Sequence, residues 1–377
     1  MLTLLTSFVV AAVCNLLIIR YFHLLRRFVA SYGGGPQQVH TGMVPRFGGV
    51  GTFAGILVAG VLLFWIHKPV QPGIVLIMLV VALPAFASGV AEDLTKRIPA
   101  WARLVCTLFS AALGVALLGA LVTRVGVPAL DNGLSFWPVA FVFTLFAVAG
   151  LAHATNIIDG FNGLSAGVSL LSLLALAYVA FKVHDLAVFH VCLGGAGAIL
   201  GFLIWNYPVG LVFLGDGGAY LMGTIIAECA VLLVVRNPQV SAWFPVLVLA
   251  YPIVETLFTI YRRTFVRRQM PDRPDALHLH SLVYRRLLGW MLNSTAEARL
   301  IARRNAMTAP YLWGLTILCI IPAVLLYKHT GWLVLATFLF LSFYVWLYAC
   351  IVKFKTPVWL RRLFAISRSH EWSTTEK

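Results

Sequence analysis

Eleven long apolar runs constrain what this chain can fold into. Each run has roughly the 20 residues that an α-helix needs to cross the hydrocarbon core of a bilayer. The runs are continuous rather than alternating between apolar and polar residues, so they predict helices and exclude the strands of a transmembrane barrel. The predicted spans are residues 2–24, 48–66, 73–91, 101–121, 137–155, 165–182, 188–205, 217–235, 242–261, 308–327 and 331–352.

Composition supports the same class of protein. Of the 377 residues, 61% are hydrophobic and 11% are charged, which is too little polar surface to enclose so many apolar side chains in a water-soluble globule. We therefore predict an all-α, polytopic integral membrane protein with about 11 transmembrane helices. One helical domain is expected over residues 1–352, with its longest cytoplasmic loop at about 262–307, followed by a basic cytoplasmic tail at 353–377.

The basic charge of the chain predicts its orientation in the membrane. The formal net charge is +15, and if the N-terminus lies outside, 23 of the 28 Lys and Arg residues fall on the inward side and five on the outward side. This split follows the positive-inside rule for an odd number of spans, with the N-terminus outside and the C-terminus cytoplasmic. Orientation accounts for the charge, and no nucleic-acid partner is expected.

Three smaller patterns concern packing rather than chemistry. The first apolar run lacks the basic start and the cleavage site of a signal peptide, so we expect it to remain as an anchor. The six cysteines lie within apolar runs without paired spacing, which predicts free thiols rather than disulfides or metal ligands. Gly197 and Gly201 form a small-xxx-small pattern, which predicts a close contact between helices.

The acidic residues show where polar chemistry is expected. Charged side chains at membrane depth are costly and tend to be functional. Glu92 and Asp93 close the third predicted span, Asp159 follows the fifth, and Asp216 precedes the eighth. All four fall on the cytoplasmic face in the arrangement of eleven spans, so separate helices are able to point these carboxylates into one shared cleft.

Two of the acidic segments carry further local signals. In "EDLTKRIPAW", Lys96 and Arg97 follow the paired acids, and Pro99 suits the first turn of the next span. In "FLGDGGAYLMG", Asp216 lies between glycines at the start of a helix, where free backbone N–H groups favour a phosphate. Each acid alone is more simply explained as a helix cap or a turn residue. Their coincidence on one face favours a common site.

The segment "NIIDGFNGL" adds amides to the carboxylates. Asn156, Asp159 and Asn162 are three residues apart, so they share one face if the segment is helical. Carboxylates and amides, beside glycines that allow close backbone approach, suit a hard cation such as Mg²⁺ bridging to a diphosphate. The sequence therefore predicts a magnesium-dependent phosphate site here.

The longest loop contributes histidines and arginines. His278 and His280, in "PDALHLHSLVYRR", point the same way only if that segment is extended. With the neighbouring arginines they form a cationic surface suited to phosphates or a sugar, although the arginines also serve to hold the loop inside. Glu255 lies two helical turns before Arg262, and an ion pair between them is as good an interpretation as catalysis. Glu228 lies mid-span without an assigned role.

Five motifs in order, "PRFGG", "EDLTK", "NIIDGFNGL", "FLGDGG" and "HLHS", resemble those of the polyprenyl-phosphate N-acetylhexosamine-1-phosphate transferases. The resemblance runs from about Pro45 to Arg286 and is closer to the N-acetylglucosamine-1-phosphate transferases of O-antigen initiation. The phospho-N-acetylmuramoyl-pentapeptide transferases have a triple-His run and a Lys-rich first loop, which this chain lacks. The resemblance implies transfer of a sugar 1-phosphate from a UDP-N-acetylhexosamine to undecaprenyl phosphate, with release of UMP.

The resemblance also implies a setting and a cofactor. The enzyme would start a cell-surface polysaccharide, such as O-antigen, capsule or exopolysaccharide, at the cytoplasmic face of the bacterial inner membrane. It would require Mg²⁺, with Mn²⁺ as the alternative cation. Membrane lipids surround such a protein, and a homodimer is left open.

Roles for individual residues follow from the matched motifs. Asp216 and Asn156 match the metal-binding positions, and Asp93 is the usual candidate for activating the lipid phosphate. The implied catalytic residues are Glu92, Asp93, Asp159 and Asp216. The expected substrate-binding residues are Arg46, Lys96, Asn156, Asn162, Phe213, His278 and His280, with Phe213 near uracil and the histidines near the sugar and phosphate.

Three positions depart from the family pattern, and the third of them leaves the sugar open. Glu92 stands where many members have Asp, and Asn162 stands where Asp is frequent. Ser281 replaces a further His of the N-acetylglucosamine enzymes. N-acetylglucosamine, N-acetylgalactosamine and a deoxy amino sugar therefore remain alternatives.

Two other classes of function compete with the transferase. A secondary transporter of an anionic substrate would place ionisable residues near the bilayer midplane, whereas here only Glu228 and Glu255 lie deeper than the interface. A non-catalytic scaffold for envelope assembly would tolerate loss of Asp216, which an enzyme would not.

Overall fold

The computed structural model describes residues 1–25, 44–66, 73–266, 277–288 and 298–353, which are mostly helical and contain no strand. Ten of the helices in this part of the chain are long and apolar enough to cross a membrane. They are α1 (Leu2–Leu25), α2 (Gly48–Ile66), α3 (Ile74–Thr95), α4 (Ala100–Leu118), α6 (Trp137–Ile157), α7 (Leu164–Lys182), α8 (Leu186–Asn206), α9 (Gly215–Arg236), α14 (Ala298–Leu325) and α15 (Thr330–Val352). The predicted all-α polytopic membrane fold is confirmed, while the outward N-terminus and the cytoplasmic C-terminus stay predictions.

The predicted span at 242–261 is not one continuous helix. It is divided into α10 (Trp243–Val248) and α11 (Ala250–Tyr261), and a π-helical turn, η2 (Arg262–Val266), extends it. Pro252 explains the break, because its ring clashes with the carbonyl four residues earlier and it lacks an N–H to donate. Leu249, between the two helices, has a ψ of 14°, away from the α-helical value.

Short helices occupy three further segments. α5 (Pro128–Leu134) was not predicted; Asp131 within it accepts hydrogen bonds from the N–H groups of Val125 and Gly126. α12 (Leu279–Leu282) and the π-helical η3 (Val283–Leu287) lie in the predicted long loop. The proposed tail falls outside the described residues from position 354 onwards.

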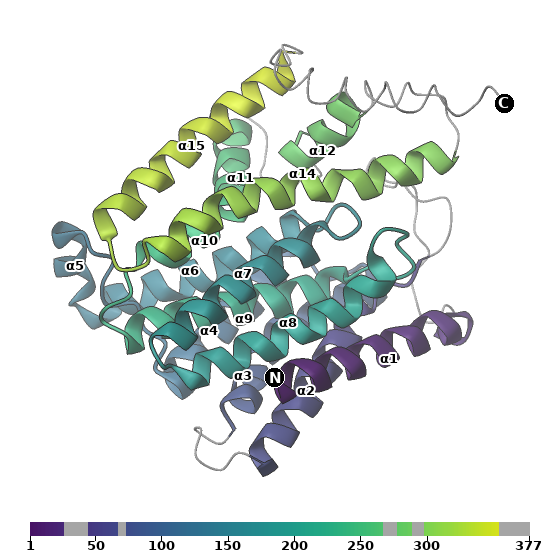
Figure 1. Cartoon of the computed structure of the whole chain (residues 1–377), viewed down its shortest axis with the longest axis horizontal. Helices are drawn as coiled ribbons and strands as arrows, with labels where there is room; N and C mark the ends of the chain where they lie inside the picture. Colours follow the sequence, from purple (N-terminus) through teal and green to yellow (C-terminus); the bar gives the residue numbers. More distant parts are fainter. Residues whose placement is uncertain (26–43, 67–72, 267–276, 289–297, 354–377) are drawn as a thin grey trace.

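α9 forms the centre of the bundle. It contacts α2, α3, α4, α6, α7 and α8. In its most apolar stretch 89% of the residues are buried, against 22% in α1, α4 and α15. In Figure 1, α7, α8 and α9 lie between α14 and α15 at the top and α1 and α2 at the bottom. Most of the other spanning helices therefore pack against α9, which fixes where their ends lie.

Small residues allow some helices to approach closely. A Cβ at Gly197 or Gly201 on α8 would overlap the carbonyl oxygen of Leu4 or Phe8 on α1. The predicted close helix contact at this pattern is confirmed. All six cysteines are free, as predicted.

Candidate active site

The motifs "PRFGG" (45–49) and "FLGDGG" (213–218) lie side by side, although more than 160 residues separate them in the sequence. Phe213 donates its N–H to Pro45 O at 2.8 Å, and Gly48 donates back to Phe213 O at 2.9 Å. Gly215, which follows, has a left-handed φ of +77°. A Cβ there would lie 2.5 Å from Asp93 Oδ2 and would overlap the carbonyl of Arg46. The glycine therefore lets this turn pass between Arg46 and Asp93.

Asp93 holds the start of α9. Its side chain is 2% exposed, and Oδ2 accepts the N–H of Gly217 at 3.0 Å. Lys96 Nζ lies 3.6 Å from the other oxygen, Oδ1. Lys96 is one of two non-glycine residues with positive φ in the described part of the chain, and this conformation ends α3. Asp93 thus fixes one of the free N–H groups at a helix N-terminus, where an anion is favoured.

Glu92, next to Asp93, has a different environment. Its Oε2 accepts the N–H of Ile98 at 2.8 Å, which closes the short connection between α3 and α4. Pro99 is the N-cap of α4 in extended conformation, one position before the first turn for which it was predicted. The carboxylate of Glu92 therefore supports the loop that carries Lys96, and its catalytic role stays a prediction.

Asp216 lies in the first turn of α9 and forms an ion pair with Arg103 on α4. The two side chains are 22% and 19% exposed, so the pair is partly shielded from solvent. Arg103 was not among the predicted site residues, because it had been counted only for its charge. A signal for its role was nevertheless available: Arg103 lies in the first turns of a span, on the face that α4 buries.

Asp159 lies in the turn after α6 and is partly buried. Burial raises the pKa of the Asp159 carboxyl to about 7; the charges of Asp216 and Asp93 also raise it, while Arg46 lowers it. The geometry agrees: Asp93 is joined to the first turn of α9 through the Gly217 N–H, Gly215 lies against the Arg46 carbonyl, and α6, which leads into the Asp159 turn, packs against α9. Three of the four predicted catalytic acids therefore gather at one end of the bundle.

Asn156 belongs to a chain of polar contacts across three helices. Its Nδ2 donates to the Tyr220 hydroxyl at 3.3 Å, and that hydroxyl lies 3.4 Å from His153 Nδ1. His153 Nε2 lies 3.3 Å from Thr107 Oγ1 on α4. His153 and Tyr220 were not predicted, although Tyr220 follows Asp216 by four residues and so shares its face of α9.

The segment that carries Asn156, Asp159 and Asn162 is not one helix. α6 ends at Ile157, and turns continue to Gly163, which has a left-handed φ of +73°. The three side chains therefore do not share a helical face.

Asn162 is bound to the neighbouring loop. It is 2% exposed, and its Nδ2 donates to Pro208 O at 3.0 Å. Its backbone N–H donates to Asn305 Oδ1 on α14 at 2.9 Å. These contacts order the turn that carries Asp159, and substrate binding by Asn162 stays a prediction. Phe213 is partly buried, and its predicted position near uracil likewise stays a prediction.

The predicted histidine pair docks against this turn. The rings of His278 and His280 are stacked, with centroids 5.1 Å apart, although the segment is not extended as that prediction required: His278 is the N-cap of α12 and His280 lies within it. His280 also packs edge-on against Phe161 at 5.6 Å. A Cβ at Gly160 would lie 3.3 Å from His280 Nε2. The fold thus brings His280 beside the turn of Asp159.

Glu255 positions the histidine segment. It accepts hydrogen bonds from the Leu279 N–H at 3.2 Å and the Tyr344 hydroxyl at 2.7 Å, and its Oε1 lies 3.0 Å from His278 Nδ1. Glu255 thus contacts His278, and the predicted ion pair between Glu255 and Arg262 stays a prediction. The Arg262 guanidinium lies over the Tyr348 ring, 5.7 Å from its centroid.

The predicted metal ligands are Asp216 and Asn156. Within the described residues, no group of three or more His, Cys, Asp or Glu side chains is arranged to hold a metal ion. Mg²⁺ is nevertheless often held by one or two carboxylates together with substrate phosphates. Asp216 supplies such a carboxylate, and Asn156, whose Nδ2 donates to Tyr220, has its amide oxygen as the ligand atom. The donors fit a cation whose coordination a phosphate completes.

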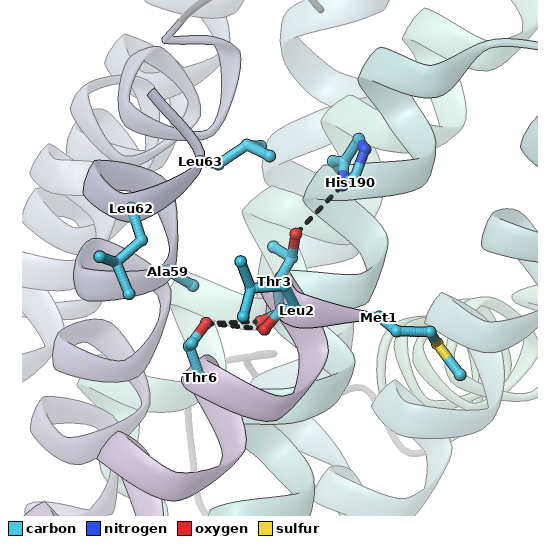
Figure 2. Close-up of a pocket in the computed structure, with 8 residues that line it drawn as sticks. All are labelled: Met1, Leu2, Thr3, Thr6, Ala59, Leu62, Leu63 and His190. Carbon is cyan, nitrogen blue, oxygen red and sulfur yellow. Dashed lines mark hydrogen bonds between the residues drawn. The ribbon is translucent and has the colours of Figure 1, made fainter. Parts of the chain in front are cut away.

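A pocket of about 50 Å³ lies between the start of α1, the C-terminal part of α2 and the start of α8 (Figure 2). His190 Nδ1 lies 3.1 Å from Thr3 Oγ1 at its edge, and the remaining lining is mostly apolar. It shares no residue with the acidic cluster and contains no carboxylate.

Comparison with known proteins gives matches that include this cluster. Residues 75–234 match the model of the family described as glycosyl transferase family 4. A Bacillus subtilis (strain 168) protein named "Probable undecaprenyl-phosphate N-acetylglucosaminyl 1-phosphate transferase" is 29% identical over 249 residues, 65% of this chain and 66% of that protein. A Thermotoga maritima undecaprenyl-phosphate alpha-N-acetylglucosaminyl 1-phosphate transferase is 28% identical over 258 residues, 67% of this chain and 72% of that protein.

A second kind of relative matches at a similar level. A phospho-N-acetylmuramoyl-pentapeptide-transferase of Lactiplantibacillus plantarum is 27% identical over 246 residues, 61% of this chain and 74% of that protein. The chain therefore spans roughly two thirds to three quarters of the length of these relatives. The family match contains Asp93, Arg103, Asn156, Asp159 and Asp216.

Proposed function

The chain belongs to the superfamily of polyprenyl-phosphate hexosamine-1-phosphate transferases, and from this we propose that it transfers an N-acetylhexosamine 1-phosphate from a UDP-amino sugar to undecaprenyl phosphate. The products are undecaprenyl-diphosphate-sugar and UMP. This step would start a cell-surface polysaccharide at the cytoplasmic face of the bacterial inner membrane. The single observation that carries the proposal is the gathering of Asp93, Asp159 and Asp216 at the ends of three helices.

In the reaction, the sugar phosphate is transferred from UMP to the lipid phosphate. An oxygen of the lipid phosphate attacks the sugar-bearing phosphorus of the UDP-sugar, and the bond from that phosphorus to the bridging oxygen of UMP breaks. Such transfers depend mainly on positioning and on neutralisation of charge. Because a phosphate is already ionised near neutral pH, Asp93 is not needed to remove a proton from it. Its hydrogen bond from the Gly217 N–H instead fixes the first turn of α9, which carries Asp216.

Basic side chains around the acids would hold the anionic substrates. Lys96 Nζ lies 3.6 Å from Asp93 Oδ1, and the charge of Arg46 lowers the pKa of Asp159. Asp216 and Asn156 would hold Mg²⁺, which supplies neutralisation of the charge that develops on the phosphates. His280, beside the Asp159 turn, would face the sugar phosphate. The gathered acids lie at helix ends rather than at the midplane, which disfavours the transporter alternative.

UMP release from purified protein in detergent tests the proposal. The assay contains undecaprenyl phosphate and a panel of UDP-N-acetylhexosamines, with and without Mg²⁺. We expect lipid-dependent and Mg²⁺-dependent UMP that is lost in Asp216→Asn. Asp131→Asn, the same change at the α5 loop, is the matched control and should retain activity. A folded protein that releases no UMP with any donor would contradict the proposal.

A further inference from the structure

The ion pair between Arg103 and Asp216 raises the question of what this arginine does in the presence of a cation. Arg103 Nη1 donates to Asp216 Oδ2, one of the predicted ligand atoms. A guanidinium has five N–H donors, and Arg103 Nε is buried without a hydrogen-bond partner in the structure. Arg103 therefore has donor capacity that Asp216 does not satisfy.

The fold fixes Arg103 at this position through one polar face of α4. Thr107 on this face lies 3.3 Å from His153 Nε2, and the Ser110 hydroxyl accepts the N–H of Ala85 at 3.1 Å. Both residues are completely buried. Their spacing from Arg103, four and seven residues, places the three on the same side of the helix. α4 is thus locked against α3 and α6, and the guanidinium is directed at the start of α9.

A fixed positive charge beside a metal ligand opposes the entry of a cation. Like charges repel at this range, and the shielding of the pair from solvent makes the repulsion stronger than in bulk water. A diphosphate changes the balance, because its oxygens accept hydrogen bonds from a guanidinium in two places at once. Arg103 then has another partner, and Asp216 is available to the cation.

We propose that Arg103 is a built-in competitor of the divalent cation for Asp216, which makes cation binding conditional on the arrival of the diphosphate. Without substrate, the arginine neutralises Asp216 and weakens cation binding. With substrate, its guanidinium turns to the diphosphate and supports the transfer. The inference rests on the proposed function, in which Asp216 holds the cation.

The proposal predicts opposite effects of one substitution on two measurements. Binding of Mn²⁺ alone to the nucleotide-free protein in detergent is measured from the free Mn²⁺ signal in electron paramagnetic resonance. Loss of a partly exposed ion pair, worth up to about 1 kcal/mol, should tighten Mn²⁺ binding roughly fivefold in Arg103→Ala and Arg103→Gln. At saturating Mg²⁺, the same variants should release UMP at a rate at least roughly tenfold below that of the wild type. Arg103→Lys, which keeps the charge, should bind Mn²⁺ within about twofold of the wild type.

Two further variants control for net charge and for the location of the ion. Arg97→Ala removes one positive charge from the exposed loop near Asp93, and it should change Mn²⁺ affinity less than about twofold because exposed charges are screened. Asp216→Asn should weaken Mn²⁺ binding. Thermal unfolding of each variant confirms that it is folded, and Arg103→Gln, which is less disruptive, decides the outcome if Arg103→Ala does not fold.

The outcomes separate the inference from the proposed function. Unchanged or weaker Mn²⁺ binding in folded Arg103→Gln would overturn the inference, as would wild-type binding in Asp216→Asn. Both results leave the proposed function standing if UMP is released with Mg²⁺. Tighter Mn²⁺ binding without any UMP release would support the competition at Asp216 and contradict the transferase reaction.

Discussion

The Tyr220 hydroxyl offers a sharp test of how the site is ordered. It accepts from Asn156 Nδ2 at 3.3 Å and lies 3.4 Å from His153 Nδ1, so Tyr220→Phe removes two contacts at once. Both are long, and each should be worth about 0.5–1 kcal/mol. The free energy of unfolding should therefore fall by about 1–2 kcal/mol. Because Asn156 is a proposed ligand, the Mg²⁺ concentration for half-maximal UMP release should rise roughly fivefold, which corresponds to about 1 kcal/mol.

Tyr251 provides the matched control for this substitution. It is also fully buried, but its hydroxyl has no hydrogen-bond partner in the structure. Tyr251→Phe should therefore leave the thermal unfolding temperature unchanged or raise it, because a buried hydroxyl without a partner is costly. Its Mg²⁺ dependence should equal that of the wild type. If Tyr220→Phe and Tyr251→Phe behave alike in both measurements, the polar chain through Asn156 does not order the site.

Three other predictions concern separate parts of the molecule. Gly114→Ala should lower the free energy of unfolding by about 1–3 kcal/mol, because the added Cβ would overlap the Glu228 carboxylate. Adding Glu228→Ala should restore the thermal unfolding temperature that Gly114→Ala lowers. A double variant no more stable than Gly114→Ala would contradict this. UMP release should rise as the pH passes through about 7, because burial raises the pKa of Asp159 to about 7 and its carboxylate forms above that pH. Asp159→Asn should abolish this rise in the pH profile. An unchanged rise in the variant would refute the assignment to Asp159. Glu255→Gln should raise KM for the UDP-sugar severalfold more than it lowers kcat, because Glu255 holds the backbone of Leu279 and not the reacting atoms; an effect confined to kcat would argue against this.

The spans were predictable because the thickness of a bilayer fixes the length of an apolar run. The predicted span 48–66 coincides with α2, and the others that are continuous end within a few residues of their helices, except at the start of α14. α14 begins ten residues before its predicted span, since an apolar run marks the apolar stretch of a helix and not the end of the helix itself. The break within the span at 242–261 was not predicted, because an apolar run does not show the effect of Pro252 on the helix. Hydropathy does not register the backbone N–H that a proline lacks.

The acids of the site were predictable and their partners were not. Asp93, Asp159 and Asp216 follow from counting helix ends, because alternate ends of successive spans lie on one face. The contact between Arg103 and Asp216 joins residues 113 positions apart, and that between Asn156 and Tyr220 joins residues 64 apart. Such contacts depend on which helices are neighbours. That order follows from packing at glycines and not from the apolar pattern.

Glycines make the convergence of charges geometrically feasible. A Cβ at Gly89 on α3 would lie 2.5 Å from Gly217 N, and one at Gly218 would lie 2.7 Å from the Cα of Gly49 on α2. The ends of α2, α3 and α9 therefore meet at backbone contact distance. No larger side chain at these positions would permit the same approach, so the N–H groups at the start of α9 reach Asp93 directly.

The same closeness creates an electrostatic problem that basic residues offset. Three carboxylates at one end of a membrane bundle repel one another and lose hydration, and Asp159 registers this cost as a raised pKa. Lys96 lies beside Asp93, Arg46 near Asp159, and Arg103 on Asp216. These cations stabilise the cluster before substrate arrives, and they are also the groups that a diphosphate attracts. Substrate binding then exchanges one set of ion pairs for another within a fixed framework, so affinity for the nucleotide and for the cation becomes coupled through the acids they share.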